Sequence, residues 1–293
     1  MPSLHHRLRT LATTGLLCAV FAASFGGPAG VAAQTVPYAR DTPFAMWEVP
    51  EGDLATVSQH GTKVLVKAFT TDFTIVRYLN TADSLGLKVV VYFNNTVDYA
   101  KGLVYPERVA AWAGKIGDHP ALYGYLSIKE PSWNGVTLTE MQALYSAYKA
   151  ADPDTQVIAL LGDTPNFGKT QNPWAAGVAD MLWVNWYPVT CTRGYYTSAS
   201  TNFPKIRAQV DSVTPGTDIW LMVQGHEYRK GNKCSPTKLQ LTRQVKDGFK
   251  YLNADGILFY TWNNALFDRD LKRNPDLIVR MNYIIRQVRA LTL

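Results

Sequence analysis

The chain has 293 residues, of which 47% are hydrophobic, 12% aromatic and only 18% charged. A disordered chain, a coiled coil and a small disulfide-stapled protein are excluded, because each differs from this composition in polarity or cysteine content. The 29 basic and 23 acidic residues give a net charge of +6. The basic residues are scattered and form no stripe or run, so we expect no binding of nucleic acid.

The first 33 residues have the order of a secretory signal peptide. A basic stretch with Arg7 and Arg9 precedes an apolar run, and small residues follow up to Ala33. The apolar run is shorter than the roughly 20 residues that a membrane span needs. No other apolar run reaches that length, so we predict export and cleavage after Ala33, with no membrane span in the mature chain. Cleavage removes two arginines and no acid, which leaves a mildly basic protein.

Eight short runs rich in β-branched and aromatic residues follow along the chain. They lie at 44–49, 63–69, 88–93, 123–128, 156–162, 180–187, 219–224 and 256–262. Most of them are apolar at nearly every position, which is typical of parallel strands buried on both faces.

Apolar residues with helical spacing fill most of the intervals between these runs. The clearest helices are predicted at 73–85, 106–116, 138–150, 203–213, 236–252 and 275–288. A capping box, formed by Thr137 and Glu140, marks the start of the third of them. The first and fifth intervals carry the weakest helical signal, and the fifth is rich in proline, glycine and asparagine.

Strands that alternate with helices imply a parallel sheet. Eight such units in about 250 residues favour a closed (β/α)8 barrel, the TIM barrel, over an open doubly wound sheet. No glycine-rich loop follows the first strand, which argues against a dinucleotide-binding fold. We therefore expect an α/β protein with a signal peptide at 1–33, a short tail at 34–42 and one barrel domain at 43–293, and we expect a monomer.

The active site of such a barrel lies at the carboxyl ends of its strands. In this chain those ends are dense in carboxylates, amides and large aromatic side chains. Aromatic faces suit the apolar C–H faces of sugar rings, and amides and carboxylates suit their hydroxyl groups. The candidate carbohydrate-binding residues are Trp47, Lys67, Asn94, Trp133, Asn185, Trp186, Tyr187, Gln224, Tyr228 and Trp262.

Cleavage of a glycosidic bond needs two carboxyl groups, one to protonate the leaving oxygen and one to attack the anomeric carbon or activate a water. Glu130 is the candidate acid, because it ends the fourth strand and is followed by the rigid Pro131. Glu227, three residues beyond the seventh strand, is the first candidate for the second carboxylate. Asp163 and Glu48 are the alternatives.

Lys129 directly precedes Glu130. Alternation along a strand places the two side chains on opposite faces, so we expect only one of them to point into the barrel mouth. If both converged there, the ammonium group would lower the pKa of the glutamate and weaken it as an acid.

The run HPALYGYLSIKEPSWNG at 119–135 resembles the fourth-strand segment of clan A-type glycoside hydrolase barrels. DMLWVNWYP, IWLMVQGHEY and GILFYTWNN resemble the sixth, seventh and eighth strands of the same barrels. The resemblance implies a retaining mechanism, with a glutamate acid/base after strand four, which Glu130 matches, and a glutamate nucleophile after strand seven.

The chain departs from that pattern at two places. Lys129 replaces the usual Asn or Asp, and Gln224 stands about where the strand-seven nucleophile is expected, with Glu227 further along. The leading hypothesis is a secreted glycoside hydrolase that acts on an extracellular poly- or oligosaccharide. A barrel that binds carbohydrate without cleaving it is the second hypothesis.

Other chemistries have little support in the sequence. The histidines of the mature chain, His60, His119 and His226, show no zinc-binding spacing, and no GxSxG elbow is present. We therefore expect no metal and no cofactor. Removal of the leader leaves Cys191 and Cys234, an even pair that predicts one disulfide in an exported protein. The two cysteines follow the sixth and seventh strands, so the bridge would join neighbouring loops on the face that carries the site.

Overall fold

The structure is a computed structural model that describes residues 39–70, 72–162, 173–196 and 198–293. The chain divides into residues 1–35 and residues 36–293. The leader predicted at 1–33 and the candidate acid Asp163 lie outside the described residues.

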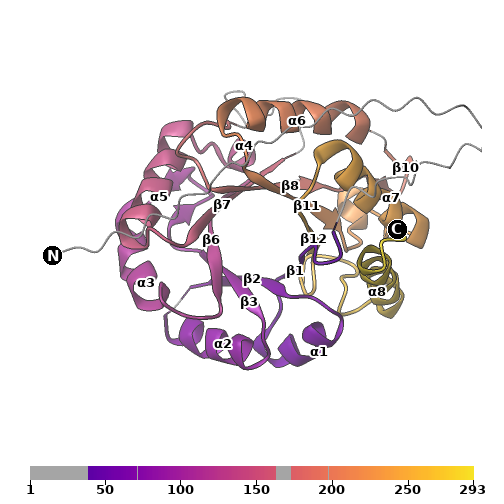
Figure 1. The fold of residues 1–293 in the computed structure, drawn as a ribbon, viewed down its shortest axis with the longest axis horizontal. Helices are drawn as coiled ribbons and strands as arrows, with labels where there is room; N and C mark the ends of the chain where they lie inside the picture. The colour runs from indigo at the N-terminus through magenta and orange to yellow at the C-terminus, as the bar shows by residue number, and fades with distance from the viewer. Residues whose placement is uncertain (1–38, 71, 163–172, 197) are drawn as a thin grey trace, which may run out of the picture. The chain divides into compact units, whose positions relative to one another are not determined.

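Eight parallel strands close into a barrel (Figure 1). In chain order they are β1 Phe44–Trp47, β2 Val64–Phe69, β3 Lys88–Phe93, β6 Leu122–Lys129, β7 Gln156–Gly162, β8 Met181–Trp186, β11 Asp218–Gln224 and β12 Gly256–Tyr260. Each strand pairs with the next one along the chain, and β12 pairs with β1 to close the ring. The predicted (β/α)8 barrel is confirmed, and every strand end lies within two residues of its predicted position.

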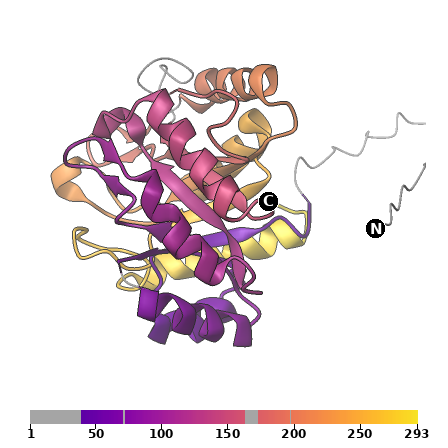
Figure 2. The same cartoon turned by 90° about the vertical axis from the view of Figure 1, so that its left-hand side faces the viewer.

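Helices surround the barrel and run along its outside (Figures 1 and 2). They are α1 Leu54–Gln59, α2 Asp72–Ser84, α3 Val109–Ile116, α4 Pro131–Asn134, α5 Leu138–Ala151, α6 Ala199–Val213, α7 Lys238–Asp247 and α8 Pro275–Arg289. The weak helical signal of the first interval corresponds to the short α1, and the described part of the fifth interval contains no helix. No described helix is long and apolar enough to cross a membrane.

Short elements complete the connections between strands and helices. Single helical turns lie at Glu51–Asp53, Pro106–Arg108 and Arg229–Gly231, and a π turn at Gly248–Leu252 extends α7. Two small hairpins follow barrel strands: β4 Val97–Asp98 with β5 Leu103–Val104 after β3, and β9 Val189–Thr190 with β10 Gly194–Tyr195 after β8.

Local capping explains where two of the helices begin. The predicted box of Thr137 and Glu140 starts α5, with the Thr137 hydroxyl accepting from the Glu140 amide and the Glu140 carboxylate accepting from the Thr137 amide. Thr237 and Gln240 form a second capping box at the start of α7. Each box satisfies backbone N–H groups that the first turn leaves without a helical partner.

The barrel interior is filled by buried side chains from all eight strands. At its centre, Trp183 on β8 stacks on Trp220 on β11, with ring centroids 5.9 Å apart. Gly256 on β12 is the register partner of Trp220. The indole of Trp220 occupies the space that a side chain at position 256 would need, so this glycine is required by packing.

Replacement of Gly256 by alanine tests this packing. An added Cβ would lie 2.5 Å from indole carbons of Trp220, so Gly256→Ala is expected to lower the free energy of unfolding by about 1–3 kcal/mol. Denaturant unfolding followed by fluorescence measures the change. Gly114→Ala, in α3, is the matched control, because nothing lies within 4 Å of its added Cβ and alanine favours a helix. An equal loss of stability in both variants would contradict the packing argument.

Candidate active site

A cleft with two lobes opens at the carboxyl ends of the strands. The first lobe, of ≈ 820 Å³, is lined by side chains that include Trp47, Glu48, Lys129, Glu130, Asn185 and Tyr260. The second lobe, of ≈ 700 Å³, is lined by residues that include Trp186, Thr190, Thr192, Arg193, Tyr196 and Asn232. Both lobes share Glu130, Asn185, Tyr187 and Lys233, so they meet beside the predicted acid.

Glu130 stands where β6 ends and α4 begins. Its amide donates to Leu160 O at 2.7 Å, and its carbonyl accepts from Asn134 Nδ2 at 2.9 Å. The backbone of Glu130 has φ 45° and ψ 56°, in the left-handed region that residues with a Cβ rarely adopt. Because the chain leaves the strand geometry here, pleat alternation stops. Lys129 and Glu130 both line the first lobe, so the expectation that only one of them would do so is wrong.

The surroundings of the Glu130 carboxyl group suit an acid. Burial raises the pKa of Glu130, whereas the hydrogen bond that Asn185 Nδ2 donates to Oε1 and the charge of Lys129 lower it. Burial has the larger effect, and the net pKa is above the usual value for a glutamate. A raised pKa favours the protonated form of the carboxyl group, which is the form that general acid catalysis requires.

Glu48 is the second acid of the first lobe. It directly follows β1 with φ 55°, so both acids of the lobe have left-handed backbones at strand ends. Glu48 Oε2 accepts from Lys67 Nζ at 2.7 Å, and Oε1 accepts from the Ala68 amide at 3.2 Å. Among the described residues, Glu48 and Glu130 are the only acids that line either lobe.

Tyr260 at the end of β12 lies within electrostatic reach of both acids. Burial raises the pKa of Tyr260 to about 12, and the charges of Glu130 and Glu48 add to that shift. The ring of Tyr260 also contacts Trp47 edge to face, at 5.5 Å between centroids, and stacks on Tyr187 at 5.6 Å. These three rings form an aromatic floor in the first lobe.

The structure does not bring Glu227 to the cleft wall. Glu227 is 5% exposed, pairs with Arg229, and forms an antiparallel bridge with Arg269. The residues on either side, His226 and Tyr228, line the first lobe, whereas Glu227 pairs with a later loop and with Arg229, a geometry that a strand-end count does not reveal. Neither lobe includes this residue among its lining side chains.

Three predicted binding residues have structural contacts instead of a place in the cleft wall. Gln224 is fully buried, and its amide group bonds the backbone of Val189 and Cys234. Trp262 is 3% exposed, and its indole N–H donates to Asp53. β12 ends at Tyr260, two residues before its predicted end, so Tyr260 and not Trp262 is the aromatic residue at the mouth of the barrel. Lys67 points to the outer side of β2 and holds Glu48.

The remaining predicted residues lie at the cleft, apart from one whose side chain is not described. Trp47, Asn94, Asn185, Tyr187 and Tyr228 line the first lobe, and Trp186 lines the second. The side chain of Trp133 lies outside the described positions.

Three further residues of the first lobe, Tyr260, His226 and Lys233, are not among the predicted binding residues. Alternation along β12 could have predicted Tyr260, because residues two apart on a strand share a face and Leu258 lies in the barrel interior. His226 and Lys233 lie in the loop after β11, where no periodic pattern operates. Burial lowers the pKa of His226 to about 4, so this imidazole is neutral at pH 7.

The predicted disulfide between Cys191 and Cys234 is confirmed, with the two Cα atoms 4.9 Å apart. It joins the hairpin after β8 to the loop after β11, where the Cys191 amide also donates to Asn232 O at 3.3 Å. Residues next to both cysteines line the second lobe. The bridge therefore fixes the wall of that lobe.

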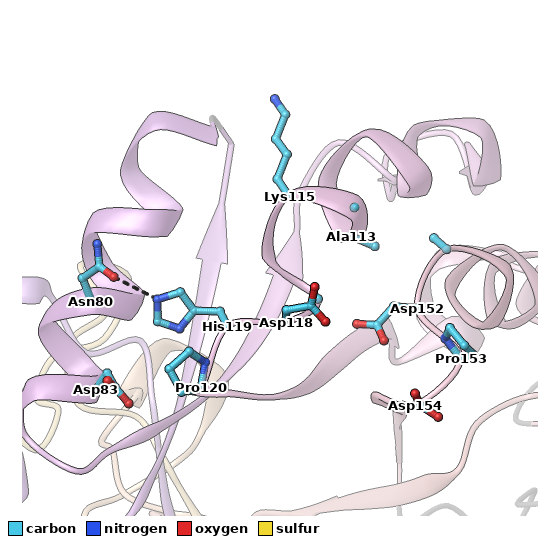
Figure 3. Close-up of a pocket in the computed structure, with 13 residues that line it drawn as sticks. Asn80, Asp83, Ala113, Lys115, Asp118, His119, Pro120, Asp152, Pro153 and Asp154 are labelled. Carbon is cyan, nitrogen blue, oxygen red and sulfur yellow. Dashed lines mark hydrogen bonds between the residues drawn. The ribbon is translucent and has the colours of Figure 1, made fainter. Parts of the chain in front are cut away.

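Another hollow, of ≈ 570 Å³, lies at the opposite end of the barrel (Figure 3). Asp118, Asp152 and Asp154 line it, and His119 Nε2 bonds Asn80 Oδ1 at 3.0 Å. These segments precede β6 and β7 and so lie at the amino ends of the strands, the end that serves stability in such barrels. Within the described residues, no group of three or more His, Cys, Asp or Glu side chains could hold a metal ion.

No family model and no curated protein matches the chain in sequence. Solved structures match its fold. A β-galactosidase from the psychrophilic Marinomonas ef1 aligns with a TM-score of 0.60 and 11% identity, over 85% of this chain and 60% of that one. A putative α-L-fucosidase from Bacteroides thetaiotaomicron aligns with a TM-score of 0.58 and 11% identity, over 89% and 99%. The likeness is one of fold.

A GH5_18 variant from Streptomyces cattleya, solved in complex with Manb1-4GlcNAc, aligns with a TM-score of 0.57 and 11% identity, over 81% of this chain and 74% of that one. This chain therefore spans less than two thirds of the β-galactosidase but most of the other two proteins. The fold implied by the resemblance to clan A-type glycoside hydrolase barrels is confirmed.

Removal of the disulfide is expected to destabilise the protein and loosen the second lobe. The cysteines are 43 positions apart, and the chain entropy of a loop of that length corresponds to about 3–4 kcal/mol. The double variant Cys191→Ser with Cys234→Ser, compared with wild type in denaturant unfolding, measures the loss. A reducing agent should bring the wild type to the stability of the variant and leave the variant unchanged. Equal stability of the oxidised wild type and the variant would contradict this expectation.

Proposed function

We propose that the protein is a secreted glycoside hydrolase that cleaves O-glycosidic bonds of a poly- or oligosaccharide. Glu130 is the general acid/base, and Glu48, in place of Glu227, is the second carboxylate. One observation carries the proposal: these two acids line one lobe in contrasting environments. Burial raises the pKa of Glu130, whereas Glu48 is held by the ammonium group of Lys67. A buried carboxyl group with a raised pKa suits the acid role, and a carboxylate held in place by an ammonium group suits the second role.

The other surfaces of the cleft support a carbohydrate substrate. Trp47, Tyr187 and Tyr260 offer aromatic faces, and Asn94 and Asn185 offer amide groups beside them. The solved structures with a similar barrel include a galactosidase, a putative fucosidase and glucuronidases. Export is supported by the composition of residues 1–33 and by the disulfide, because such bridges persist in oxidising compartments.

The proposed reaction proceeds in two displacements. Glu130 gives its proton to the glycosidic oxygen as the bond from that oxygen to the anomeric carbon breaks. The carboxylate of Glu48 attacks the same carbon and forms a glycosyl ester. In the second step Glu130 takes a proton from water, the water oxygen bonds to the anomeric carbon, and the ester bond to Glu48 breaks. Lys67 Nζ donates to Glu48 Oε2 at 2.7 Å and fixes the position of the attacking carboxylate.

A carbohydrate-binding barrel without hydrolytic activity is the second candidate function. The observation that favours it lies after β11, where the resemblance implies a nucleophile. Gln224 is fully buried there, and Glu227 pairs with Arg229 and does not line the cleft. Binding without release of new sugar ends would distinguish this function from hydrolysis.

Substitution of the two acids tests the assignment. Glu130→Gln and Glu48→Gln are each expected to reduce kcat at least about a hundredfold, because each removes one of the two groups that the reaction needs. Glu227→Gln should stay close to wild type. The measurement is the release of reducing ends from a polysaccharide panel, with binding measured in parallel to show that the variants still hold substrate.

Two results would contradict the assignment of the acids. Full activity of Glu130→Gln removes the proposed acid. A large loss of activity in Glu227→Gln, together with full activity of Glu48→Gln, would identify Glu227 and not Glu48 as the second carboxylate.

The stereochemistry of the product tests the two-displacement mechanism. Two successive inversions at the anomeric carbon retain its configuration. Proton NMR of the first sugar released, recorded before mutarotation, should therefore show the anomer of the substrate. Appearance of the opposite anomer would mean that Glu48 activates a water and does not attack the sugar itself.

A further inference from the structure

Basic side chains are prominent among the described residues of the cleft wall. Among the described residues that line the two lobes, Lys129, Arg193 and Lys233 are cationic, and Glu48 and Glu130 are acidic. The charge of Glu48 is already balanced by Lys67, which lies behind the wall. Among the described lining residues, cations therefore outnumber acids by three to two.

Arg193 provides the most accessible of these charges. It lies in the turn of the hairpin β9–β10, where its amide donates to Thr190 Oγ1 at 3.1 Å. Its side chain is exposed and lines the second lobe. Within the described part of the chain, the guanidinium group of Arg193 has no acidic partner. The disulfide at Cys191 holds the turn in place.

The residues around Arg193 can hold one sugar unit. Tyr196 lines the same lobe and is 56% exposed, and its amide donates to Pro188 O at 2.8 Å. Its open ring can stack on a sugar face, and the side chains of Thr192 and Asn232 offer hydrogen bonds. A guanidinium group beside them pairs with a carboxylate through two parallel hydrogen bonds. These are the groups that recognise a sugar with a carboxylate.

The continuity of the cleft connects this position to the reacting bond. The second lobe shares Glu130, Asn185 and Tyr187 with the first. A sugar chain that passes from one lobe to the other therefore crosses Glu130. Lys233, whose ammonium group donates to Tyr187 O at 2.5 Å, lines the place where the lobes meet.

We infer that the substrate is an acidic polysaccharide that contains uronate units, and that Arg193 binds the carboxylate of a unit in the second lobe while the bond beside Glu130 is cleaved. This inference rests on the proposed function, because it names the substrate class of the same site. A neutral chain would leave the guanidinium of Arg193 without an anionic partner. A chain that spans both lobes is cleaved internally.

Paired substrates test the inference. The probes are polygalacturonate, alginate, glucuronoxylan and hyaluronan, each compared with its carboxyl-reduced derivative. Wild type is expected to bind and cleave at least one parent polymer, with a preference over its reduced form that weakens as salt is added. Arg193→Gln should raise Kd and KM for that parent about tenfold, the loss expected for one charge-assisted contact, and leave the reduced polymer within about twofold.

Arg286→Gln is the matched control. Arg286 is an exposed arginine on α8, outside both lobes, and its substitution makes the same change in net charge. It should leave Kd and KM unchanged for every probe. An equal effect of both substitutions would mean that the whole charge of the protein acts, and it would overturn a specific role for Arg193.

The remaining outcomes separate the inference from the proposed function. Binding of reduced and parent polymers with equal affinity, or no binding of any uronate polymer, overturns the inference. A preference for carrageenan, which carries sulfate and no carboxylate, overturns the uronate assignment. If Glu130→Gln loses activity and Arg193→Gln has no effect, the hydrolase proposal is supported and the uronate inference is overturned. A selective effect of Arg193→Gln on binding, without cleavage by wild type, supports the inference and overturns hydrolysis.

Discussion

The filling of the barrel interior is the constraint on which the site depends. Trp183 and Trp220 stack on neighbouring strands inside the barrel, and Trp220 occupies space left by the missing Cβ of Gly256. Trp47 packs on Trp183 at 6.5 Å between centroids, and Tyr260 packs on Trp47. The upper layer of this core is thus also the floor of the cleft. A floor made of close-packed aromatic rings resists displacement, so the acids stand on a rigid base.

The walls of the cleft are built differently from its floor. They are loops, which are joined to each other by covalent and polar links. The Gln224 amide bonds the backbone of Val189 and Cys234, in two adjacent loops beside the second lobe, and the bridge from Cys191 to Cys234 joins the same two loops. A buried amide with several partners and a disulfide both restrict the loops they connect. Core packing therefore holds the floor of the cleft, and cross-links between loops hold its wall.

The sequence predicts the parts of the structure that follow a regular pattern of residues, and it fails where no such pattern exists. Apolar runs such as 88–93 and 156–162 are buried on both faces, and their strand bounds followed directly from composition. The place of Glu130 at the cleft could be predicted, because this residue stands at a strand end directly before a proline. The order of the candidates for the second carboxylate did not follow, because the loop after β11 has no repeating pattern: Glu227, the first candidate, does not line the cleft, whereas the alternative Glu48 does. The convergence of Lys129 and Glu130 depends on one left-handed residue, which alternation cannot express.

Both acids of the first lobe occupy backbone conformations that glutamate tolerates poorly. Glycine or asparagine adopts positive φ with less cost, by an amount on the order of 1 kcal/mol for each position. Selection for thermal stability alone would therefore favour loss of the carboxyl group at 48 and at 130. A library of variants sorted only by melting temperature should therefore become enriched in well-folded barrels without acids at positions 48 and 130. A search for thermostable variants that keep both acids would have to select for the acids as well.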